Sequence, residues 1–577
     1  MTRNSIQALA TLLVVATLIR LAAATAGLPL PLASDEEVMI GGALRMIELR
    51  NPVPTLSPLL AETLYYPPLV AWLYAAAIVP VAAALWMSNG FVSLADMALA
   101  LSFSPEFYWY AARTVSVAFG VATVAVVFGI GRELRFGTPA ALFAAALVVV
   151  DPTHLMMSAT ARHWSATVFF ICATILFSLR VLRDGRLADY RWAALLGGLG
   201  FGASYIGGLG LGALLAAHVA QAIRMRRLFG LVDRAAVETL VIAGALIAVF
   251  ALAHIPAIER LVGAKAILPV SQPKTIEGFF ANAWFFLRAY LWSNPVLAAG
   301  GLAALVATLA CWRERRAIAV CALVFVLCYA AFLYVFMPKE ERYALPQVPI
   351  LALALAALLG QIANPRAVAV SAAVLLAYPA ACTIQLTLLM AAPDTRLAAR
   401  RWVEATPEAR AGVGVHAPGI WFRNTPGAVA AIAAVDPGAL RNRDRQIAAL
   451  GDRTTPVRLP PPVAYVDLDQ INAAAWRKAG IGPVAFLRAQ GWRYAVLATL
   501  RDWRAPDWYP DFTACGTVVA EFASAPDADY DLDMRRTLIF REPSWTWFGR
   551  SGFGPPVRIY DLHAASDAAA CRARTGQ

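Results

Sequence analysis

Long apolar stretches recur along this chain from its first residues to about residue 391. A helix needs about 20 mostly apolar residues to cross the hydrocarbon core of a bilayer, which is about 30 Å thick. The chain is 60% hydrophobic and only 15% charged, whereas soluble domains are about one quarter charged. We therefore predict a polytopic α-helical membrane protein with about 11–13 transmembrane helices. The predicted spans are 7–27, 111–131, 138–153, 165–182, 192–207, 208–224, 235–255, 292–312, 317–336, 346–362 and 366–391.

The basic residues between these stretches indicate the orientation of the chain. They gather on one side of the alternation, at Arg3, 132–135, 180–191, 224–234, 313–316 and Arg366. Because cytoplasmic loops are enriched in Lys and Arg, the N-terminus is predicted to be cytoplasmic. We predict a multi-pass protein of a bacterial inner (plasma) membrane, in which the other side is periplasmic. The periplasmic segments are then 28–110, 154–164, 256–291, 337–345 and everything after 392. This topology accounts for the net charge of +12, so we expect no nucleic-acid partner.

One apolar segment, residues 68–88, does not fit this alternation. It is long enough to span, but a single crossing there would invert every later basic loop. Since Pro67, Pro68 and Pro80 interrupt it, we expect a re-entrant or surface-lying helix. The alternative is a true crossing followed by a second one at 91–110.

The first predicted outer loop opens with three consecutive acids. Ser34 and Glu37 have the spacing of a helix capping box, and acids are favourable in a first helical turn. Consecutive carboxylates also repel one another and hold protons more tightly, which suits a general base. Asp35 and Glu36 are therefore candidate catalytic residues, although capping alone explains Ser34 and Glu37.

Aromatic and polar residues gather in two further positions of the predicted outer face. Tyr66 lies in a Tyr-Tyr-Pro-Pro turn, and Arg162 and His163 precede Trp164 after the third span. Arginine binds phosphate oxygens and aromatic rings stack on sugar rings. Tyr66, Arg162 and His163 are thus candidate substrate-binding residues, with anchoring at the membrane interface as the alternative.

The short loop 337–345 carries two acids and two bases between two apolar spans. Basic residues on the outer face oppose the topology signal, which favours a functional role. Arg342 is suited to grip phosphate oxygens with two hydrogen bonds and Lys339 to add a point charge. We predict that Lys339, Glu341, Arg342 and Tyr343 bind substrate. The alternative is that the four charges pair with each other.

Several short motifs occur in a fixed order along the chain. They are Asp35-Glu36, YYPPL at 65–69, Arg113, GRELRFG at 131–137, Ser158–Trp164, the ERYxLPxxP pattern at 341–349 and Asp394-Thr395-Arg396 followed by Trp402. Their order and membrane placement resemble the GT-C glycosyltransferases of the protein O-mannosyltransferase and aminoarabinose-transferase group, over residues 1 to about 405. The resemblance implies that Asp35 is catalytic with Glu36 as its neighbour. It also implies that the donor is a sugar on a polyprenyl phosphate, held by Arg342 and Lys339. Asp35 is followed by two acids rather than one, which leaves the division of labour between Asp35 and Glu36 open.

These observations predict an integral-membrane glycosyltransferase that acts by a single displacement with inversion. Asp35 takes a proton from the acceptor, which is a lipid, a glycan or a protein, and the cations stabilise the departing phosphate. We expect no metal and no other cofactor, because no His, Cys or carboxylate cluster has ligand spacing. Membrane lipid is the remaining expected partner.

Two alternatives of other classes stay open. A transporter or flippase of lipid-linked sugars would share the outer charges, but such proteins usually carry ionisable residues at mid-membrane or inverted repeats. A non-catalytic scaffold for cell-envelope glycan assembly would tolerate Asp35→Asn.

The chain divides into two predicted domains. Residues 1–391 form a GT-C-like transmembrane catalytic module, in which 28–110 is the first outer loop with juxtamembrane or re-entrant helices. Residues 392–577 form a periplasmic α/β domain, because β-like runs alternate with Ala-rich helical patterns. These runs are 463–466, 494–497, 517–521, 537–540 and 557–560. Cys515 and Cys571 are the only cysteines of this domain, and in an oxidising periplasm we expect a disulfide between them.

Overall fold

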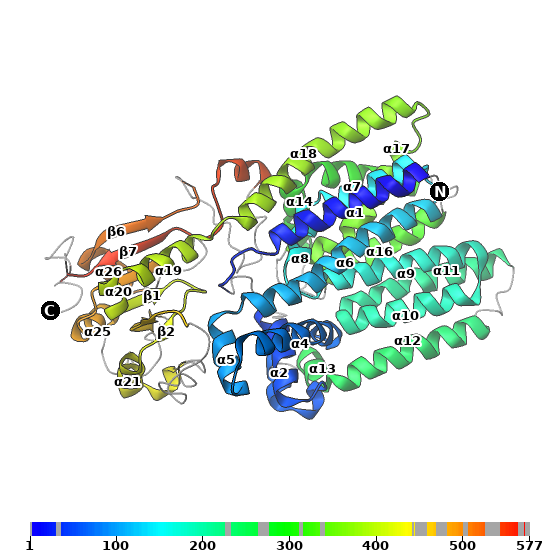
Figure 1. Cartoon of the computed structure of the whole chain (residues 1–577). Coiled ribbons are helices and arrows are strands. Elements are labelled where there is room, and N and C mark those ends of the chain that lie inside the picture. The colour runs from blue at the N-terminus through cyan, green and yellow to red at the C-terminus, as the bar shows by residue number, and fades with distance from the viewer. Residues whose placement is uncertain are drawn as a thin grey trace.

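The computed structural model describes residues 3–30, 36–225, 232–262, 276–310, 316–334, 341–440, 444, 459–468, 482–499, 506–525, 543–563 and 571. Within them, eight helices are long and apolar enough to cross a membrane, or nine if one bent pair counts as a span. The helices form a bundle whose last member leads into a C-terminal part that contains the strands (Figure 1). The predicted helical membrane fold with a C-terminal α/β domain is confirmed.

Most bundle helices overlap the predicted spans. The bundle helices are α1 (Arg3–Ala23), α6 (Glu106–Glu133), α7 (Thr138–Val149), α8 (Pro152–Ala159), α9 (Trp164–Asp184), α10 (Leu187–Ala203), η2 (Tyr205–Gly210), α11 (Leu211–Arg224), α12 (Arg234–Ala253), α14 (Ile276–Ser293), η4 (Val296–Gly300, a π-helical turn), α15 (Gly301–Ala310), α16 (Arg316–Tyr334), η5 (Glu341–Gln347), α17 (Val348–Leu359) and α18 (Pro365–Ala391). However, α14 lies largely in 256–291, which was predicted as an outer loop, and α8 and η5 lie largely in the predicted outer segments 154–164 and 337–345. Helix α17 is buried along almost its whole length, and it packs against α7 and α15 in the middle of the bundle.

Five short helices and the 21-residue helix α4 gather at the end of the bundle that is next to the C-terminal part, here called the domain-facing end (Figure 1). They are α2 (Glu36–Leu49), η1 (Pro54–Leu56), α3 (Pro58–Thr63), α4 (Leu69–Asn89), α5 (Leu94–Phe103) and α13 (Ile255–Val262). Apolar side chains of α2, α3, α4 and α5 share a second buried core with α6 and α9. All of the helices at the domain-facing end except α13, which follows α12, occupy the positions of the first predicted outer loop.

The expectation that prolines interrupt residues 68–88 is wrong. Leu69–Asn89 is one continuous helix, α4, with Pro80 inside it. A proline inside a helix removes one hydrogen bond and can kink the helix, yet α4 continues through the exposed Pro80 to Asn89. Helix α5 follows and has only ten residues, about 15 Å, which is too short for the second crossing considered at 91–110.

The predicted span 138–153 is bent by 60° between α7 and α8. Asp151 caps α8 by accepting a hydrogen bond from the backbone N–H of His154 (2.8 Å), and Pro152 occupies the first turn. Asp is a favoured N-cap and Pro a favoured first helical residue. The sequence Asp-Pro therefore starts a new helix where a straight span was expected.

The C-terminal part contains a five-stranded mixed sheet in the order β4-β1-β5-β7-β6. The described strands and helices are α19 (Thr395–Ala405), α20 (Pro407–Ala411), β1 (Val413–His416), β2 (Arg423–Asn424), α21 (Pro426–Val435), η6 (Pro437–Ala439), β3 (Pro462–Val463), β4 (Tyr465–Asp467), α25 (Pro483–Ala489), β5 (Tyr494–Ala498), α26 (Tyr509–Cys515), β6 (Thr517–Phe522), η9 (Ser544–Gly549) and β7 (Val557–Asp561). Strand β1 pairs in parallel with β4 and β5, and β7 pairs antiparallel with β5 and β6. The central strand β5 is buried at every position, as expected for a strand covered on both faces.

Two features tie the C-terminal part together and to the bundle. Cys515 and Cys571 form the predicted disulfide. Phe103 of α5 packs against Trp421, with ring centres 5.8 Å apart, and the guanidinium of Arg400 lies over the same indole at 5.1 Å. The sheet domain is thus seated on the domain-facing end of the bundle.

Candidate functional site

Glu36, the first residue of α2, lies at the centre of a buried polar cluster. Its carboxylate accepts two hydrogen bonds from the guanidinium of Arg113 (2.8 and 2.7 Å), one from the indole of Trp109 (3.0 Å) and one from the backbone N–H of Ala161 (2.5 Å). Neither side chain of the ion pair is exposed. Glu36 therefore joins α2 to α6 and to the loop that precedes α9.

Arg113 extends this cluster to the chain that follows α1. Its Nη1 donates to the carbonyl oxygens of Ala24 and Ala26, each at 2.8 Å. The first loop is thus fixed at Ala26 and again at Glu36. The predicted base, Asp35, lies between these positions in the sequence and outside the described residues.

The contacts of Glu36 bear on its predicted catalytic role. Four donors already occupy the lone pairs of its two oxygens. A base must accept a further proton from the acceptor substrate within hydrogen-bond reach, which would displace one of these donors. The geometry favours a positioning role for Glu36, and the assignment of the base to Asp35 stays a prediction.

Several predicted substrate-binding residues meet in a row of four rings. Ring centres are 4.1 Å apart for Tyr66 and His163, 4.7 Å for His163 and Trp164, and 5.3 Å for Trp164 and Tyr343. The guanidinium carbon of Arg342 lies 5.6 Å from the ring centre of Tyr343. This aromatic row, made of Tyr66, His163, Trp164 and Tyr343, joins three segments that are far apart in the sequence.

Arg162 lies in the loop that precedes α9, next to His163 of the aromatic row. Its side chain is almost fully buried. Its carbonyl oxygen accepts hydrogen bonds from Tyr74 Oη of α4 (2.9 Å) and Ser116 Oγ of α6 (3.4 Å). Helices α4 and α6 thereby fix the loop that carries Arg162 and His163.

The segment after α16 is placed by contacts from α14. Tyr290 Oη lies within hydrogen-bond distance of the carbonyl oxygen of Ala344 and of Gln347 Oε1 (2.6 Å for the second), and its single proton is shared between them. These bonds hold η5, which contains Arg342 and Tyr343. Of Glu341 only the backbone is described, and Lys339 lies outside the described residues.

A second buried polar cluster was not predicted from the sequence. Arg20 Nε donates to Ser158 Oγ (2.9 Å), and Arg20 Nη2 lies 2.9 Å from His154 Nδ1. Asn294 Nδ2 donates to Asp151 Oδ2 (3.0 Å). Arg20 is charged, fully buried and inside an apolar run, and such residues usually have a structural or functional partner. That isolated charge was the signal available in the sequence.

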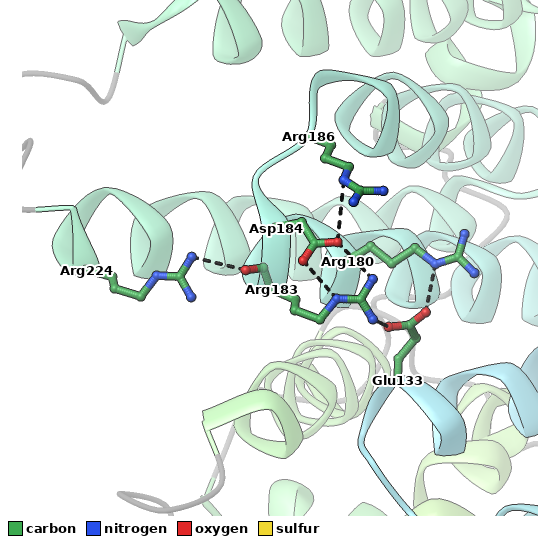
Figure 2. Close-up of polar contacts among 6 residues, drawn as sticks. All are labelled: Glu133, Arg180, Arg183, Asp184, Arg186 and Arg224. Carbon is green, nitrogen blue, oxygen red and sulfur yellow. Dashed lines mark hydrogen bonds and ion pairs between the residues drawn. The ribbon is translucent and has the colours of Figure 1, made fainter.

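A third polar cluster lies at the far end of the bundle. Figure 2 shows its members, Glu133, Arg180, Arg183, Asp184, Arg186 and Arg224. Glu133 pairs with Arg180 (2.9 Å) and with Arg183, and Asp184 pairs with Arg183 (2.9 Å). Glu133 is twenty positions after Arg113 on α6, about 30 Å along the helix, which equals the thickness of a hydrocarbon core. The GRELRFG motif therefore joins α6 to α9 at the end opposite the aromatic row.

Metal binding has no support from side-chain grouping. In the described part of the chain, no three His, Cys, Asp or Glu side chains are close enough to hold a metal ion. The expectation of a site without a metal stays a prediction.

Fold and site together define a multi-span membrane protein whose buried ionic cluster and aromatic row lie at one end of the bundle. Residues 94–254 match the family model described as dolichyl-phosphate-mannose-protein mannosyltransferase. This match confirms the predicted resemblance to the GT-C glycosyltransferases and covers the region that contains Arg113, Glu133 and Arg162. A comparison of the sequence with curated proteins found no match.

Solved structures with a similar arrangement include three glycosyltransferases of low sequence identity. The chain is 13% identical to ArnT from Cupriavidus metallidurans, solved with undecaprenyl phosphate, over 96% of this chain and 97% of that chain, with a TM-score of 0.46. It is 13% identical to the Archaeoglobus fulgidus oligosaccharyltransferase, over 85% and 69%, with a TM-score of 0.42. It is 17% identical to the Saccharomyces cerevisiae Pmt1-Pmt2 complex bound to the sugar donor, with a TM-score of 0.32. That comparison covers 46% of this chain and only 36% of the yeast chain. At these identities and TM-scores, the three structures do not establish the activity or the substrates of this chain.

Proposed function

We propose that this protein is a glycosyltransferase that moves a sugar from a polyprenyl-phosphate donor to a lipid, glycan or protein acceptor. The reaction takes place at the domain-facing end of the bundle. With the basic loops in the cytoplasm, this end faces the periplasm of a bacterial inner membrane, the N-terminus is cytoplasmic, and α4 stays on the outer side without crossing.

The hydrogen bond between Glu36 and Ala161 carries the proposal. It joins residues 125 positions apart. Glu36 is the covalent neighbour of Asp35, and Ala161 is the neighbour of Arg162, which opens the loop of the aromatic row. Two regions singled out separately from the sequence, one acidic and one rich in Arg and aromatic residues, are therefore attached to each other.

The proposed reaction is a single displacement at the anomeric carbon. The acceptor oxygen or nitrogen forms a bond to that carbon, and the bond to the donor phosphate breaks with its electron pair leaving on the phosphate oxygen. Asp35 takes the acceptor proton. Arg342 and Lys339, with Arg162, stabilise the charge on the departing polyprenyl phosphate. Because attack and departure occur on opposite sides of the carbon, the configuration inverts.

The rings of the aromatic row have a separate task. Tyr66, His163 and Tyr343 offer apolar faces and polar edges, which suit the stacking and orientation of a sugar ring. The charged groups of Glu36 and Arg113 are buried against each other and are not available to substrate, so they act as positioning residues. They hold the acidic loop and the loop before α9 in register.

The experiment is sugar transfer by the full chain in nanodiscs, with a panel of polyprenyl-phosphate sugars and membrane extract as acceptor. Asp35→Asn is compared with Glu37→Gln, a matched control because Glu37 belongs to the same run of three acids and is exposed. We expect Asp35→Asn to abolish transfer while donor binding is retained, and Glu37→Gln to behave as the wild type. Equal transfer by Asp35→Asn and wild type would overturn the assignment of the base. In proteoliposomes, which enclose a compartment, movement of intact donor across the bilayer without transfer to any acceptor would instead indicate a flippase.

A further inference from the structure

Turn η9 of the C-terminal part lies against a membrane helix rather than within the sheet domain. Tyr378 Oη of α18 and Ser544 Oγ are 2.7 Å apart, and Gln385 Nε2 donates to the carbonyl of Trp547 at 3.0 Å. Trp547 is fully buried and belongs to the same apolar core as Leu386 of α18. In Figure 1 this segment is the orange-red turn beside α18.

The depth of η9 follows from the length of α18. The helix has 27 residues, which is about 40 Å, against a hydrocarbon core of about 30 Å. Tyr378 is the middle residue of α18. Even if the excess length protrudes entirely at one end, the middle of the helix stays about 10 Å inside the core. Ser544, which contacts the Tyr378 side chain, therefore lies inside the hydrocarbon core. Trp547 is bonded to Gln385, six residues before the domain-side end of α18, or about 9 Å along the helix, so the turn rises from Ser544 towards the boundary of the leaflet on the domain side.

The two faces of η9 differ in burial. A 3₁₀ turn has three residues per turn, so Ser544 and Trp547 share one face and Trp545 and Phe548 share the next. The first pair is fully buried, whereas Trp545 is 57% exposed and Phe548 is 51% exposed. Residues 543–549 carry no charge. An uncharged turn with outward Trp and Phe at this depth has the composition of a membrane-interface anchor.

We infer that η9 is a lipid anchor of the C-terminal domain. Trp545 and Phe548 insert into the boundary between headgroups and acyl chains of the leaflet on the domain side, next to α18. The anchor is coupled to the domain at two points. The backbone N–H of Ser551 donates to Ser524 (2.9 Å), and the carbonyl of Phe553 accepts from the N–H of Thr395 at the start of α19 (3.0 Å).

A lipid anchor gives η9 a role that is separate from the folding of the sheet and from the proposed catalysis. Besides the covalent link between α18 and α19, the domain is held to the membrane by a second point further along the chain. Two attachments restrict rotation of the domain about the link, which keeps Trp421 against Phe103 of α5 at the domain-facing end. The occupant of the exposed face is lipid, because the face continues the lipid-facing surface of a spanning helix.

The test uses spin labels on single cysteines of the full chain in phosphatidylethanolamine–phosphatidylglycerol nanodiscs. Phe548→Cys and Trp545→Cys are compared with Val519→Cys on β6, a matched exposed apolar position of the domain (46% exposed). Cys172, Cys321 and Cys382 are buried, and Cys311 and Cys328 are replaced by Ala to remove background labelling. The accessibility of each label to oxygen, which partitions into lipid, and to a water-soluble nickel chelate is measured by EPR.

Labels at 545 and 548 are expected to be several-fold more accessible to oxygen than to the nickel chelate, and the label at 519 to show the reverse. Water-like accessibility at 545 and 548 would overturn the anchor. Low accessibility to both reagents would overturn lipid as the occupant and indicate a protein partner or a second copy. None of these outcomes depends on glycosyltransferase activity, because no substrate is present.

Discussion

Glu36 and Arg113 form a doubly hydrogen-bonded ion pair in which both side chains are completely buried. Charges taken out of water in this way are stabilised only by each other and by further donors. Here Trp109 and Ala161 supply those donors to the carboxylate. The pair therefore makes the positions of α2, α6 and the loop before α9 interdependent.

Loss of one partner of this pair should be strongly destabilising. We expect Arg113→Met to lower the free energy of unfolding by about 3–5 kcal/mol, because the Glu36 carboxylate is left buried without its counter-charge. Thermal unfolding in detergent is the measurement. Arg45→Met is the control, since the Arg45–Glu48 pair on α2 is exposed and such pairs contribute about 0–1 kcal/mol. Equal effects of the two substitutions would contradict a structural role for the buried pair.

Tyr66 tests whether the aromatic row contributes to donor binding. Its ring lies 4.1 Å from that of His163, and such ring pairs contribute about 0.5–1.5 kcal/mol beyond burial. We expect Tyr66→Leu to raise the KM for the donor by up to about tenfold, while Tyr66→Phe, which keeps the ring, stays close to wild type. A loss of the same size in Tyr66→Phe would assign the effect to the hydroxyl instead of the ring.

Most of the membrane fold follows from the sequence because lipid imposes one requirement. Every spanning segment must be a long apolar helix, and hydropathy detects this directly. The bend at Asp151 and the continuity of α4 were not predicted. In both places a proline competes with an apolar helical pattern, and the sequence does not show whether the helix continues. At Asp151 the N-cap and Pro152 start a new helix, whereas α4 continues through Pro80. Strand β1 was also missed, because it is short and contains a glycine, Gly414. The fold requires this glycine, since a Cβ would lie 2.7 Å from a side-chain atom of Leu487.

The candidate site was predictable as a set of residues but not as contacts. Arg, His and Tyr at the domain-facing end stand out because polar residues are rare beside apolar spans. Which of them meet depends on helix packing that no spacing rule encodes. Trp164 completes the aromatic row between His163 and Tyr343, and Arg113 selects Glu36 from three consecutive acids. Both assignments needed the structure.

The Arg493–Asp561 pair should make the C-terminal domain sensitive to acid. The hydrogen bond from Arg493 (2.5 Å) lowers the pKa of Asp561 below its ordinary value. A carboxyl whose pKa is lower in the folded state stabilises the fold above its ordinary pKa of about 3.9. That contribution is lost as the pH falls below about 4, through the folded-state pKa.

The measurement is the melting temperature of the full chain from pH 6 to pH 3, followed by tryptophan fluorescence. We expect the wild type to be more stable than Arg493→Gln at pH 6, and the difference to shrink towards pH 3. Arg558→Gln is the control, because its pair with Glu521 is about half exposed and should contribute little. A difference that is independent of pH would exclude the Asp561 carboxyl as its source.

The Cys515–Cys571 disulfide closes a loop with a sequence separation of 56. In the chain-entropy model a loop of this length contributes about 4 kcal/mol to stability. We expect Cys515→Ser with Cys571→Ser to lower the melting temperature of the domain and to remove its sensitivity to reducing agents. Mapping of the unreduced protein by mass spectrometry should yield the linked peptides, and free thiols at both positions would reject the pairing.

Gly120 determines how closely α6 approaches α8. A Cβ at this position would lie 2.4 Å from Ser158 Cβ and 3.3 Å from Arg20 Nε, so Gly120→Ala must push α6 away from α8 and from the Arg20–Ser158 hydrogen bond that joins α8 to α1. Overpacking of this kind costs about 1–3 kcal/mol, although Ala is about 1 kcal/mol better than Gly inside a helix. Gly129→Ala on the same helix is the control, because its Cβ would meet Leu176 at an ordinary 3.5 Å and should be neutral or stabilising.

The same contact predicts a specific rescue. Ser158→Gly removes the Cβ that Gly120→Ala would strike, so the double variant should be less destabilised than the sum of the two single variants. The two changes share one contact, and coupling of about 0.5–3 kcal/mol is expected for such neighbours. Thermal unfolding of the four proteins of this cycle provides the coupling energy. Strict additivity would show that the cost of Gly120→Ala does not arise from its contact with Ser158. The hydrogen-bonded cluster around Arg20 would then not depend on how closely α6 packs against α8.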